Sequence, residues 1–530
     1  MPLETSSRVV QALTRRGYNA EREAVTLIAE SSTPELALEA AIETAPEDAL
    51  VLTVDHVREA LDAEPVPDPE QVDGAARSTE SAAAASSEPT NDAVNSDPSV
   101  STGVSGGGSP HGTGAVPDET EGNTVVDRSP QAPVVANDMT GASTGTGAYD
   151  EFVGVFRDRY ERLSGQLRGR VNHRPADSIE AMGGGADVEL IGLVNDIRST
   201  ASGHWLVELE DTTGTFPCLV MKDRDIADLV DELLMDECIA VTGTLADDAG
   251  IVFVDAIHFP DVPRTHRPNT ADRHVQAALV SDVHVGSQEF LADAWGRFAD
   301  WLHTEEAEHV EYLLIAGDMV EGVGVYPNQD EELDIIDIYE QYETFSEHLK
   351  QVPGDMEIVM IPGNHDAVRL AEPQPGFDEE LRGIMSAHDP QIVSNPAMVD
   401  VEGVNVLMYH GVSLDEVIAE LPEEKASYDE PHKAMYQLLK KRHVAPQFGG
   451  KTRVAPEERD YLVIDEVPDV FHTGHVHKLG WGKYHNVLAV NSGCWQAQTD
   501  FQKSVNIDPD VAHAPILDLD TLDMTVRKFA

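Results

Sequence analysis

The chain has 530 residues, which is too long for one hydrophobic core and predicts two or three folded units joined by linkers. It contains 96 Asp and Glu against 36 Lys and Arg, yet 41% of its residues are hydrophobic, which excludes wholesale disorder. Because the acidic residues are spread along the chain, we interpret the net charge of -60 as adaptation to high salt. An ordinary acidic protein with a charged tail is the alternative.

The cysteines and the apolar runs bear on the cellular compartment. Cys218, Cys238 and Cys494 lie far apart without a CxxC pair, which fits neither a disulfide framework nor a zinc knuckle. The N-terminus has no apolar core of signal-peptide length, and no run of about 18 apolar residues occurs. We therefore expect a soluble, cytoplasmic protein that is not bound to a membrane.

The first part of the chain predicts a small module on a tether. Residues 1–63 place apolar positions at helical spacing, and Thr33, Pro34 and Glu35 form a helix start, so three or four short helices are expected. Such a unit is typical of protein docking. Residues 64–148 are rich in Ser, Gly, Pro, Ala and acid, and we predict a disordered linker there.

The middle of the chain predicts a helical connector followed by a barrel. Residues 149–182 restart the helical periodicity, whereas residues 183–265 contain alternating or short apolar runs. These runs predict five or so strands, with a helix at 225–235 between the third and the fourth. This is the pattern of an OB-like β-barrel. A generic barrel without a role in nucleic-acid binding is the alternative.

From about residue 272, apolar segments end in the polar motifs SDVHVG, AGDMVEG, PGNHD, YHG and TGHVHKLG. Polar residues at the carboxyl ends of strands are typical of α/β active sites. We explain the D-x-H and H-x-H spacings by a strand end, where residues i and i+2 project to one side. One histidine on a strand is more often structural, but five motifs in series predict a metal site. The candidates are Asp282, His284, Asp318, Asn364, His365, His410, His475 and His477.

This series of motifs resembles the calcineurin-like metallophosphoesterase superfamily over residues 272–530. The resemblance implies an α/β fold with a two-sheet sandwich flanked by helices. It also implies that one metal is held by Asp282, His284 and His477 and the other by Asn364, His410 and His475. Asp318 would bridge the two ions, and His365 would be catalytic without being a ligand.

The expected chemistry is phosphoester hydrolysis with two divalent ions. Two such ions about 4 Å apart lower the pKa of a bridging water and favour in-line attack at phosphorus. His365 can protonate the leaving oxygen. Oxygen and nitrogen ligands without thiolate suit Mn²⁺ best, with Fe and Zn as alternatives.

The order of helical segment, linker, OB-like barrel and phosphoesterase is also that of the small subunits of replicative DNA polymerases. Segments 438–484 and 490–503 resemble the archaeal D-family small subunits, and the resemblance spans 150–530. It implies a 3′-to-5′ exonuclease that proofreads single-stranded DNA ends for a separate large polymerase subunit. DNA and that subunit are the expected partners, with a sliding clamp or primase as further candidates. Eukaryotic small subunits have lost metal ligands, but every metal position is filled here, so we predict activity.

Five cations near Gly449 and Gly450 stand out in this acidic chain: Lys440, Lys441, Arg442, Lys451 and Arg453. They predict a DNA- or partner-binding surface, with a solvated helix end plus a turn as the alternative. Trp481 and Trp495 could stack a base, although packing is the more usual role. Two rival functions stay open: a free-standing phosphoesterase, and a catalytically silent scaffold subunit.

Overall fold

The structure is a computed structural model. It describes residues 9, 19–20, 22–31, 34–44, 51–54, 56–58, 128–142, 145, 147–326, 329–504 and 507–530. The chain divides into two compact units, Met1–Gly114 and Ala115–Ala530, and each is described by itself. Within the described ranges, no helix is both long enough and apolar enough to cross a membrane.

The described part of the first unit is a small helical core. Its elements are β1 (Asn19–Ala20), α2 (Arg22–Glu30), α3 (Pro34–Thr44) and β2 (Val51–Leu52), and the two short strands pair in parallel. Helix α3 begins at Pro34, as the sequence predicts, because proline lacks the N–H that a first helical turn leaves unpaired. The strand pair was not predicted.

Most of the predicted linker at 64–148 lies outside the described residues, but residues 128–142 contradict it. There, β3 (Val134–Ala136) pairs antiparallel with β13 (Ala397–Val401). The buried Arg128 donates a hydrogen bond to the carbonyl oxygen of Val310 at 2.8 Å and forms an ion pair with Asp355 at 3.2 Å. We call residues 128–142 the strap, because they pack across later parts of the second unit.

The second unit continues with a helical connector and a closed barrel, as predicted. The helices are α5 (Tyr149–Leu167) and α6 (Ala176–Glu180). The strands are β4 (Asp187–Ser199), β5 (Trp205–Asp211), β6 (Gly214–Val220), β7 (Cys238–Leu245) and β8 (Val252–His258), in the order β4-β5-β6-β8-β7. The expected helix between the third and fourth strands is the 3-10 helix η1 (Asp225–Glu232).

Two six-stranded sheets follow. The first has the order β12-β11-β10-β9-β18-β19, with β9 (Gln276–Val280), β10 (Val310–Ala316), β11 (Glu357–Ile361), β12 (Gln391–Ile392), β18 (His513–Asp518) and β19 (Asp523–Lys528). The second has the order β16-β17-β15-β14-β13-β3, and its further strands are β14 (Val404–Met408), β15 (Val470–Thr473), β16 (Leu479–Tyr484) and β17 (Val487–Ser492).

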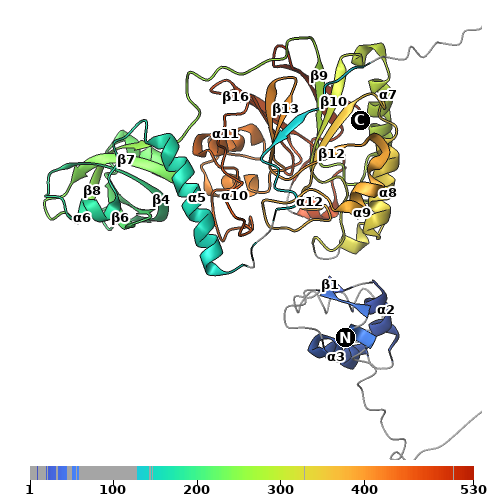
Figure 1. Cartoon of the computed structure of the whole chain (residues 1–530), viewed down its shortest axis with the longest axis horizontal. Coiled ribbons are helices and arrows are strands. Elements are labelled where there is room, and N and C mark those ends of the chain that lie inside the picture. Colours follow the sequence, from blue (N-terminus) through green and yellow to red (C-terminus); the bar gives the residue numbers. More distant parts are fainter. Residues whose placement is uncertain are drawn as a thin grey trace, which may run out of the picture. The chain divides into compact units, whose positions relative to one another are not determined.

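Helices cover the outer faces of both sheets, in agreement with the predicted mixed α/β fold (Figure 1). They are α7 (Ala292–Leu302), α8 (Ile338–Leu349) and α9 (Glu379–Ile384) on the first sheet, and α10 (Leu414–Glu420) and α11 (Pro431–Lys441) on the second. The remaining short helices are η2 (Glu305–Ala307), η3 (Gln329–Glu331), η4 (Ser386–His388) and α12 (Asp500–Ser504). Alternate residues of a strand face opposite sides. In β10, Leu313 and Ile315 therefore pack toward α7 and α8, whereas Tyr312 and Leu314 face the second sheet.

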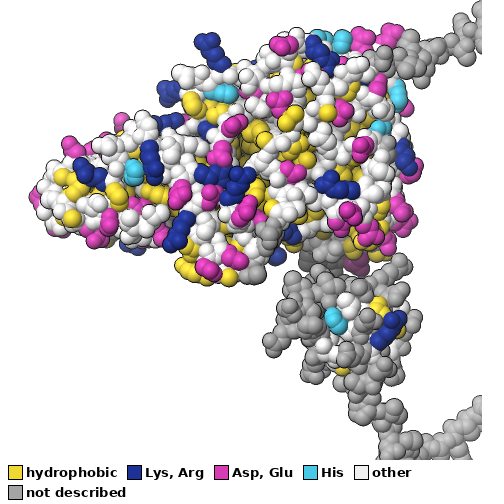
Figure 2. Space-filling view, in the orientation of Figure 1, with side chains coloured by type: hydrophobic (Ala, Val, Ile, Leu, Met, Phe, Trp, Pro, Cys, Tyr) yellow, Lys and Arg dark blue, Asp and Glu magenta, His cyan; other side chains and the backbone are white. Residues whose placement is uncertain are grey.

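The acidic side chains of the second unit are scattered over its visible face rather than gathered in one patch (Figure 2). Lys and Arg side chains lie among them in small groups. This distribution agrees with the high-salt interpretation better than with a charged tail, since a tail would leave the folded surface less acidic.

A buried ionic cluster joins α5 to the C-terminal part of the second unit. The Nε of Arg159 lies 2.6 Å from Oδ2 of Asp460, and its Nη1 donates to the carbonyl oxygen of Pro446 at 2.5 Å. His443 Nε2 lies 2.9 Å from the same Asp460 oxygen, while the N–H of Ala445 donates to His443 Nδ1 at 3.1 Å. The ring is therefore a neutral tautomer with its proton on Nε2.

This tautomer predicts a pH dependence of stability. Burial, together with the charge of Arg159, lowers the pKa of His443 to about 4. Between pH 6.5 and 4 the unfolded chain binds a proton that the folded chain does not, so stability falls as the pH falls. We expect His443 to lower the free energy of unfolding by roughly 3 kcal/mol as the pH falls over that range.

The measurement is the free energy of unfolding against pH in molar KCl. His443→Gln keeps an N–H donor for Asp460 but cannot titrate, so its stability should vary less with pH between 6.5 and 4. The control is the exposed His309→Gln, which should keep the wild-type slope. Equal slopes for His443→Gln and wild type would contradict the prediction.

Candidate metal centre

The predicted metal ligands and the candidate catalytic His365 all follow the carboxyl ends of central strands. Asp282 and His284 follow β9, Asp318 follows β10, Asn364 and His365 follow β11, His410 follows β14, and His475 and His477 follow β15. Since these strands are neighbours in two packed sheets, the loops meet at one edge of the sandwich. The structure brings all of these side chains together.

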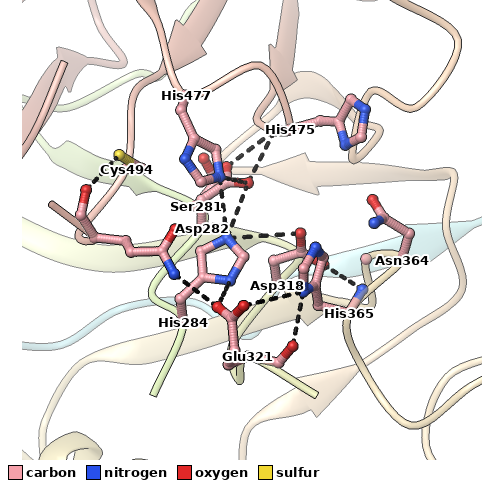
Figure 3. A network of polar contacts seen from close by, with 12 residues as sticks. Ser281, Asp282, His284, Asp318, Glu321, Asn364, His365, His475, His477 and Cys494 are labelled. Carbon is pink, nitrogen blue, oxygen red and sulfur yellow. Dashed lines mark hydrogen bonds and ion pairs between the residues drawn. The ribbon is translucent and has the colours of Figure 1, made fainter. Parts of the chain in front are cut away.

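The side chains form two ligand groups, and Asp318 lies between them. Asp318 is grouped with His410 and His475, and it also lies within reach of His284 from the first group. Figure 3 shows Asp282, His284, Asp318 and His477 close together. In the first group, Nε2 of His284 lies 3.0 Å from Nε2 of His477, and Oδ1 of Asp282 lies 3.3 Å from the same His477 atom. Two imidazole nitrogens at this separation, beside a carboxylate, fit a shared cation. This is the group that the resemblance assigns to one metal.

The second group is built around His410. Its Nε2 lies 3.0 Å from Oδ1 of Asn364 and 3.2 Å from Oδ2 of Asp318, and His475 completes the group. The Nδ1 of His410 donates to the carbonyl oxygen of Ala316 at 2.8 Å, which leaves its Nε2 lone pair for a cation. Asp318 Oδ2 is also 3.8 Å from Nε2 of His284, so this carboxylate faces both groups.

The backbone at the cluster corrects our explanation of the D-x-H and H-x-H spacings. Asp282 and His284 have φ of 54° and 56°, and His475 and His477 have φ of 69° and 55°. These residues are therefore left-handed loop residues beyond the strand ends, not alternating strand residues. For residues other than glycine this conformation is strained by about 1–3 kcal/mol each, and such strain collects at functional sites.

Two glycines of the motifs allow the backbone to approach the carboxylates. A Cβ at Gly363 would collide with Oδ1 of Asp318, and a Cβ at Gly474 would collide with Oδ2 of Asp282. The glycines in PGNHD and TGHVH therefore have a steric reason to stand beside the ligands. Larger residues would displace the carboxylates from both groups.

The electrostatics of the cluster favour cations. Burial opposes a charge on His410, but Asp318 outweighs it and raises the pKa of His410 to about 10. In the same way, Glu321 and Asp282 raise the pKa of His284 well above its usual value despite burial. Carboxylates that attract protons to buried imidazoles also attract metal ions, so the donor set fits the divalent ions that we predict.

His365 lies beside the ligand groups and faces a cavity. Its Nδ1 lies 2.7 Å from the carbonyl oxygen of Glu321 and donates to it, so its Nε2 is the nitrogen left for chemistry. Its side chain is 16% exposed and lines a cavity of about 150 Å³. Other lining residues are Asp318, Tyr326, Asp415, Tyr428 and His475. The volume suits a phosphate group and part of a nucleotide, so most of a bound strand would lie outside.

The predicted basic island is not one surface. Lys441 and Arg442 are buried: Nζ of Lys441 lies 3.1 Å from Oε2 of Glu237, and Nε of Arg442 donates to a backbone carbonyl oxygen. Lys440 pairs with Glu232 at 2.6 Å. The prediction of DNA or partner binding is wrong for these buried cations, because they join α11 and its end to the barrel and to neighbouring backbone.

Lys451 and Arg453 of the predicted island are exposed, so the structure leaves them available for binding.

The two tryptophans near the site differ in exposure. Trp495 is fully buried and packs against Trp295 with ring centroids 5.2 Å apart, so it is not free to stack a base. Trp481 is 48% exposed on β16.

Comparison with known proteins places the chain in a family. Residues 277–479 match the family model of the B subunits of DNA polymerases alpha and epsilon. The DNA polymerase II small subunit of Halobacterium salinarum is 64% identical over 530 residues, which is 100% of both chains. That of Archaeoglobus fulgidus is 45% identical over 383 residues, covering 71% of this chain and 76% of the other. The chain belongs to the small subunits of archaeal DNA polymerase II.

A solved archaeal phosphodiesterase aligns with 48% of this small subunit and 99% of its own chain, at 14% identity and a TM-score of 0.25. That score is too low to support a shared fold.

Glu321 is a residue of this polymerase small subunit that our sequence analysis missed. It is 1% exposed, its Oε2 lies 2.9 Å from Nδ1 of His284, and its carbonyl oxygen accepts from His365. Gln496 also donates to its carboxylate at 2.7 Å. Glu321 therefore orients a candidate ligand and the candidate catalytic histidine together. The sequence offered a clue, because Glu321 is an acidic residue within the motif AGDMVEG, three residues after Asp318.

Proposed function

We propose that this small subunit carries a two-metal 3′-to-5′ exonuclease that acts on single-stranded DNA ends for the large polymerase subunit. The observation that carries the proposal is the pair of ligand groups with Asp318 between them and with His365 at the cavity beside them. Every position that the two-metal motifs require is filled. We assign the sandwich to the calcineurin-like phosphoesterases because its motifs resemble theirs. We assign the barrel to the OB-like folds because of its pattern of strands.

The proposed chemistry is hydrolysis of a phosphodiester. When bound, two divalent ions, with Mn²⁺ preferred over Fe or Zn, supply an acidified water and positive charge opposite the phosphoryl oxygens. The Nδ1–H of His365 donates to the carbonyl oxygen of Glu321, which directs Nε2 toward the cavity. The imidazolium form of His365, which has a proton on both nitrogens, is the form that can deliver a proton from Nε2 to the leaving oxygen.

The family gives the proposal its substrate and partner. The relatives are named as small subunits of a DNA polymerase, so a large polymerase subunit and DNA are the partners that we propose. A sliding clamp or a primase is a further candidate. A free-standing phosphoesterase fits the metal groups but not the 64% identity to a polymerase subunit. A silent scaffold fits the family but leaves the complete ligand set without a role.

The test is Mn²⁺-dependent digestion of 3′-labelled and 5′-labelled single-stranded oligonucleotides at molar KCl, with the chain alone and with its large subunit. We expect stepwise loss from the 3′ end, and a rate about 10²–10⁴-fold lower for His365→Ala. The matched control is the exposed His309→Ala, at the opposite end of β10 from the cluster. Brisk hydrolysis of a small phosphoester without DNA cleavage would favour the free-standing enzyme, and inactivity on both substrates would favour the scaffold.

A further inference from the structure

The segment Gly449–Arg453, which we call the basic loop, carries two cations, Lys451 and Arg453. Lys451 and Arg453 are exposed, while Thr452 between them is buried, so the two cations stand on the outer side of the loop. Among the described residues, neither side chain forms a hydrogen bond or a close ion pair, and the charge of Asp415 acts on Lys451 at longer range. In a chain with 96 acidic residues, cations left unpaired beside a cavity need an explanation.

The basic loop is held in a defined position by Glu416 of α10. Its carboxylate is nearly buried and accepts a hydrogen bond from the N–H of Thr452 at 2.7 Å. A Cβ at Gly450 would collide with the same carboxylate, which explains the glycine. The backbone that carries Lys451 and Arg453 is therefore held in place by Glu416.

Both ends of the basic loop connect to the candidate metal centre. Asp415, next to Glu416, lies 3.5 Å from Nε2 of His475 and accepts from the hydroxyl of Tyr428 at 2.9 Å, and it lines the cavity. Lys451 is close enough to Asp415 to interact with it electrostatically. Asp415 lines the cavity and Glu416 holds the basic loop, and both are adjacent residues of α10. Helix α10 therefore links the cavity to the basic loop.

At the other end, the carbonyl oxygen of Arg453 accepts from the N–H of Glu372 at 2.8 Å. The Glu372 carboxylate accepts from the hydroxyl of Tyr409 at 2.9 Å, and Tyr409 precedes the candidate ligand His410. The basic loop is thus connected to the candidate ligand His410 through Glu372 and Tyr409. A shift of the loop would move these residues as well.

We infer that the basic loop binds the phosphodiester backbone of the DNA strand whose end occupies the cavity. This inference rests on the proposed function and extends it with a strand-binding site. The cavity holds only part of a nucleotide, so the preceding phosphates must lie outside, and exposed cations on a fixed loop are suited to receive them. An Arg side chain can bind a phosphate through two parallel hydrogen bonds, and such contacts persist when salt screens longer-range attraction.

The test uses Lys451→Gln with Arg453→Gln in the full chain bound to its large subunit, at molar KCl. We expect the KM for a single-stranded oligonucleotide to rise about tenfold with kcat within about twofold, because contacts remote from the reacting phosphate mainly set binding. Hydrolysis of bis(4-nitrophenyl) phosphate, too short to reach the loop, should be unaffected. The control, Lys350→Gln with Lys528→Gln, removes the same charge at the far end of α8 and on β19.

Binding of a fluorescent oligonucleotide in EDTA gives an independent readout. We expect a Kd about tenfold higher, and a salt dependence of log Kd shallower by about 1.4, since each phosphate contact on a single strand contributes about 0.7. If binding changes in this way but the wild type cleaves no DNA, the exonuclease proposal fails and the basic loop stands. Unchanged Kd and KM overturn the inference, as does loss of large-subunit binding by the loop variant, which would assign the loop to the partner protein.

Discussion

Asp318→Asn is expected to lower metal-dependent DNA hydrolysis by at least about a thousandfold, which corresponds to about 4 kcal/mol of transition-state stabilisation. Its Oδ2 is 3.2 Å from Nε2 of His410 and 3.8 Å from Nε2 of His284, so one carboxylate oxygen faces a ligand nitrogen of each group. Asparagine keeps the shape but removes the charge and one of the two strong ligand oxygens. Both groups should therefore lose affinity for a divalent ion.

The measurement combines the exonuclease rate at saturating Mn²⁺ with calorimetric Mn²⁺ binding. We expect Asp318→Asn to bind fewer ions, or to bind them at least tenfold more weakly, while the fold is retained. Asp300→Asn, an exposed change of the same kind on α7, should match the wild type. Two tightly bound ions and a rate within tenfold of the wild type would contradict a bridging role.

Arg159→Met is expected to destabilise the second unit by about 3–5 kcal/mol. The guanidinium is fully buried on α5, and it is paired with Asp460 and bonded to the carbonyl oxygen of Pro446. Methionine fills much of the volume but leaves the Asp460 carboxylate buried without its cation. The loss should therefore be larger than for any exposed charge on the same helix.

Chemical unfolding at constant KCl measures this effect. Arg157→Met, an exposed arginine of α5, should change the free energy of unfolding by less than about 0.5 kcal/mol. Adding Asp460→Asn to Arg159→Met should recover part of the loss, because the uncompensated charge is removed. If the double variant is no more stable than Arg159→Met alone, the buried charge is not the cause.

The candidate site could be predicted because each of its motifs is a short, continuous stretch of the sequence. Each polar motif follows a short apolar run, and carboxyl ends of neighbouring strands meet, so Asp282, Asp318 and His410 could be grouped from the sequence. The reason given for the spacing was nevertheless wrong, since His284 and His477 have positive φ and lie beyond the strands. Backbone conformation in a loop depends on the surrounding packing, which a pattern of residue types does not contain.

The strap and the buried cations were not predictable for a related reason. Val134 and its neighbours form a strand because the edge of β13 offers backbone partners, and nothing in their composition predicts that edge. Lys441 and Arg442 were counted as surface charges, because a sequence does not show that Glu237 and the carbonyl oxygen of Ile464 lie opposite them. In both cases the partner is far away in the chain.

The strap also has a consequence for how the protein is made. Asp138 bonds to Ser394, which is 256 residues later in the chain, so the strap is synthesised long before the sheet edge that it covers. The barrel can form as it leaves the ribosome, whereas the second sheet gains its last strand only after much of the C-terminal half exists. A gene fragment that starts at the sandwich would therefore encode a sheet whose edge strand is β13, whereas one that starts before Arg128 would encode the sheet in which β3 covers that edge.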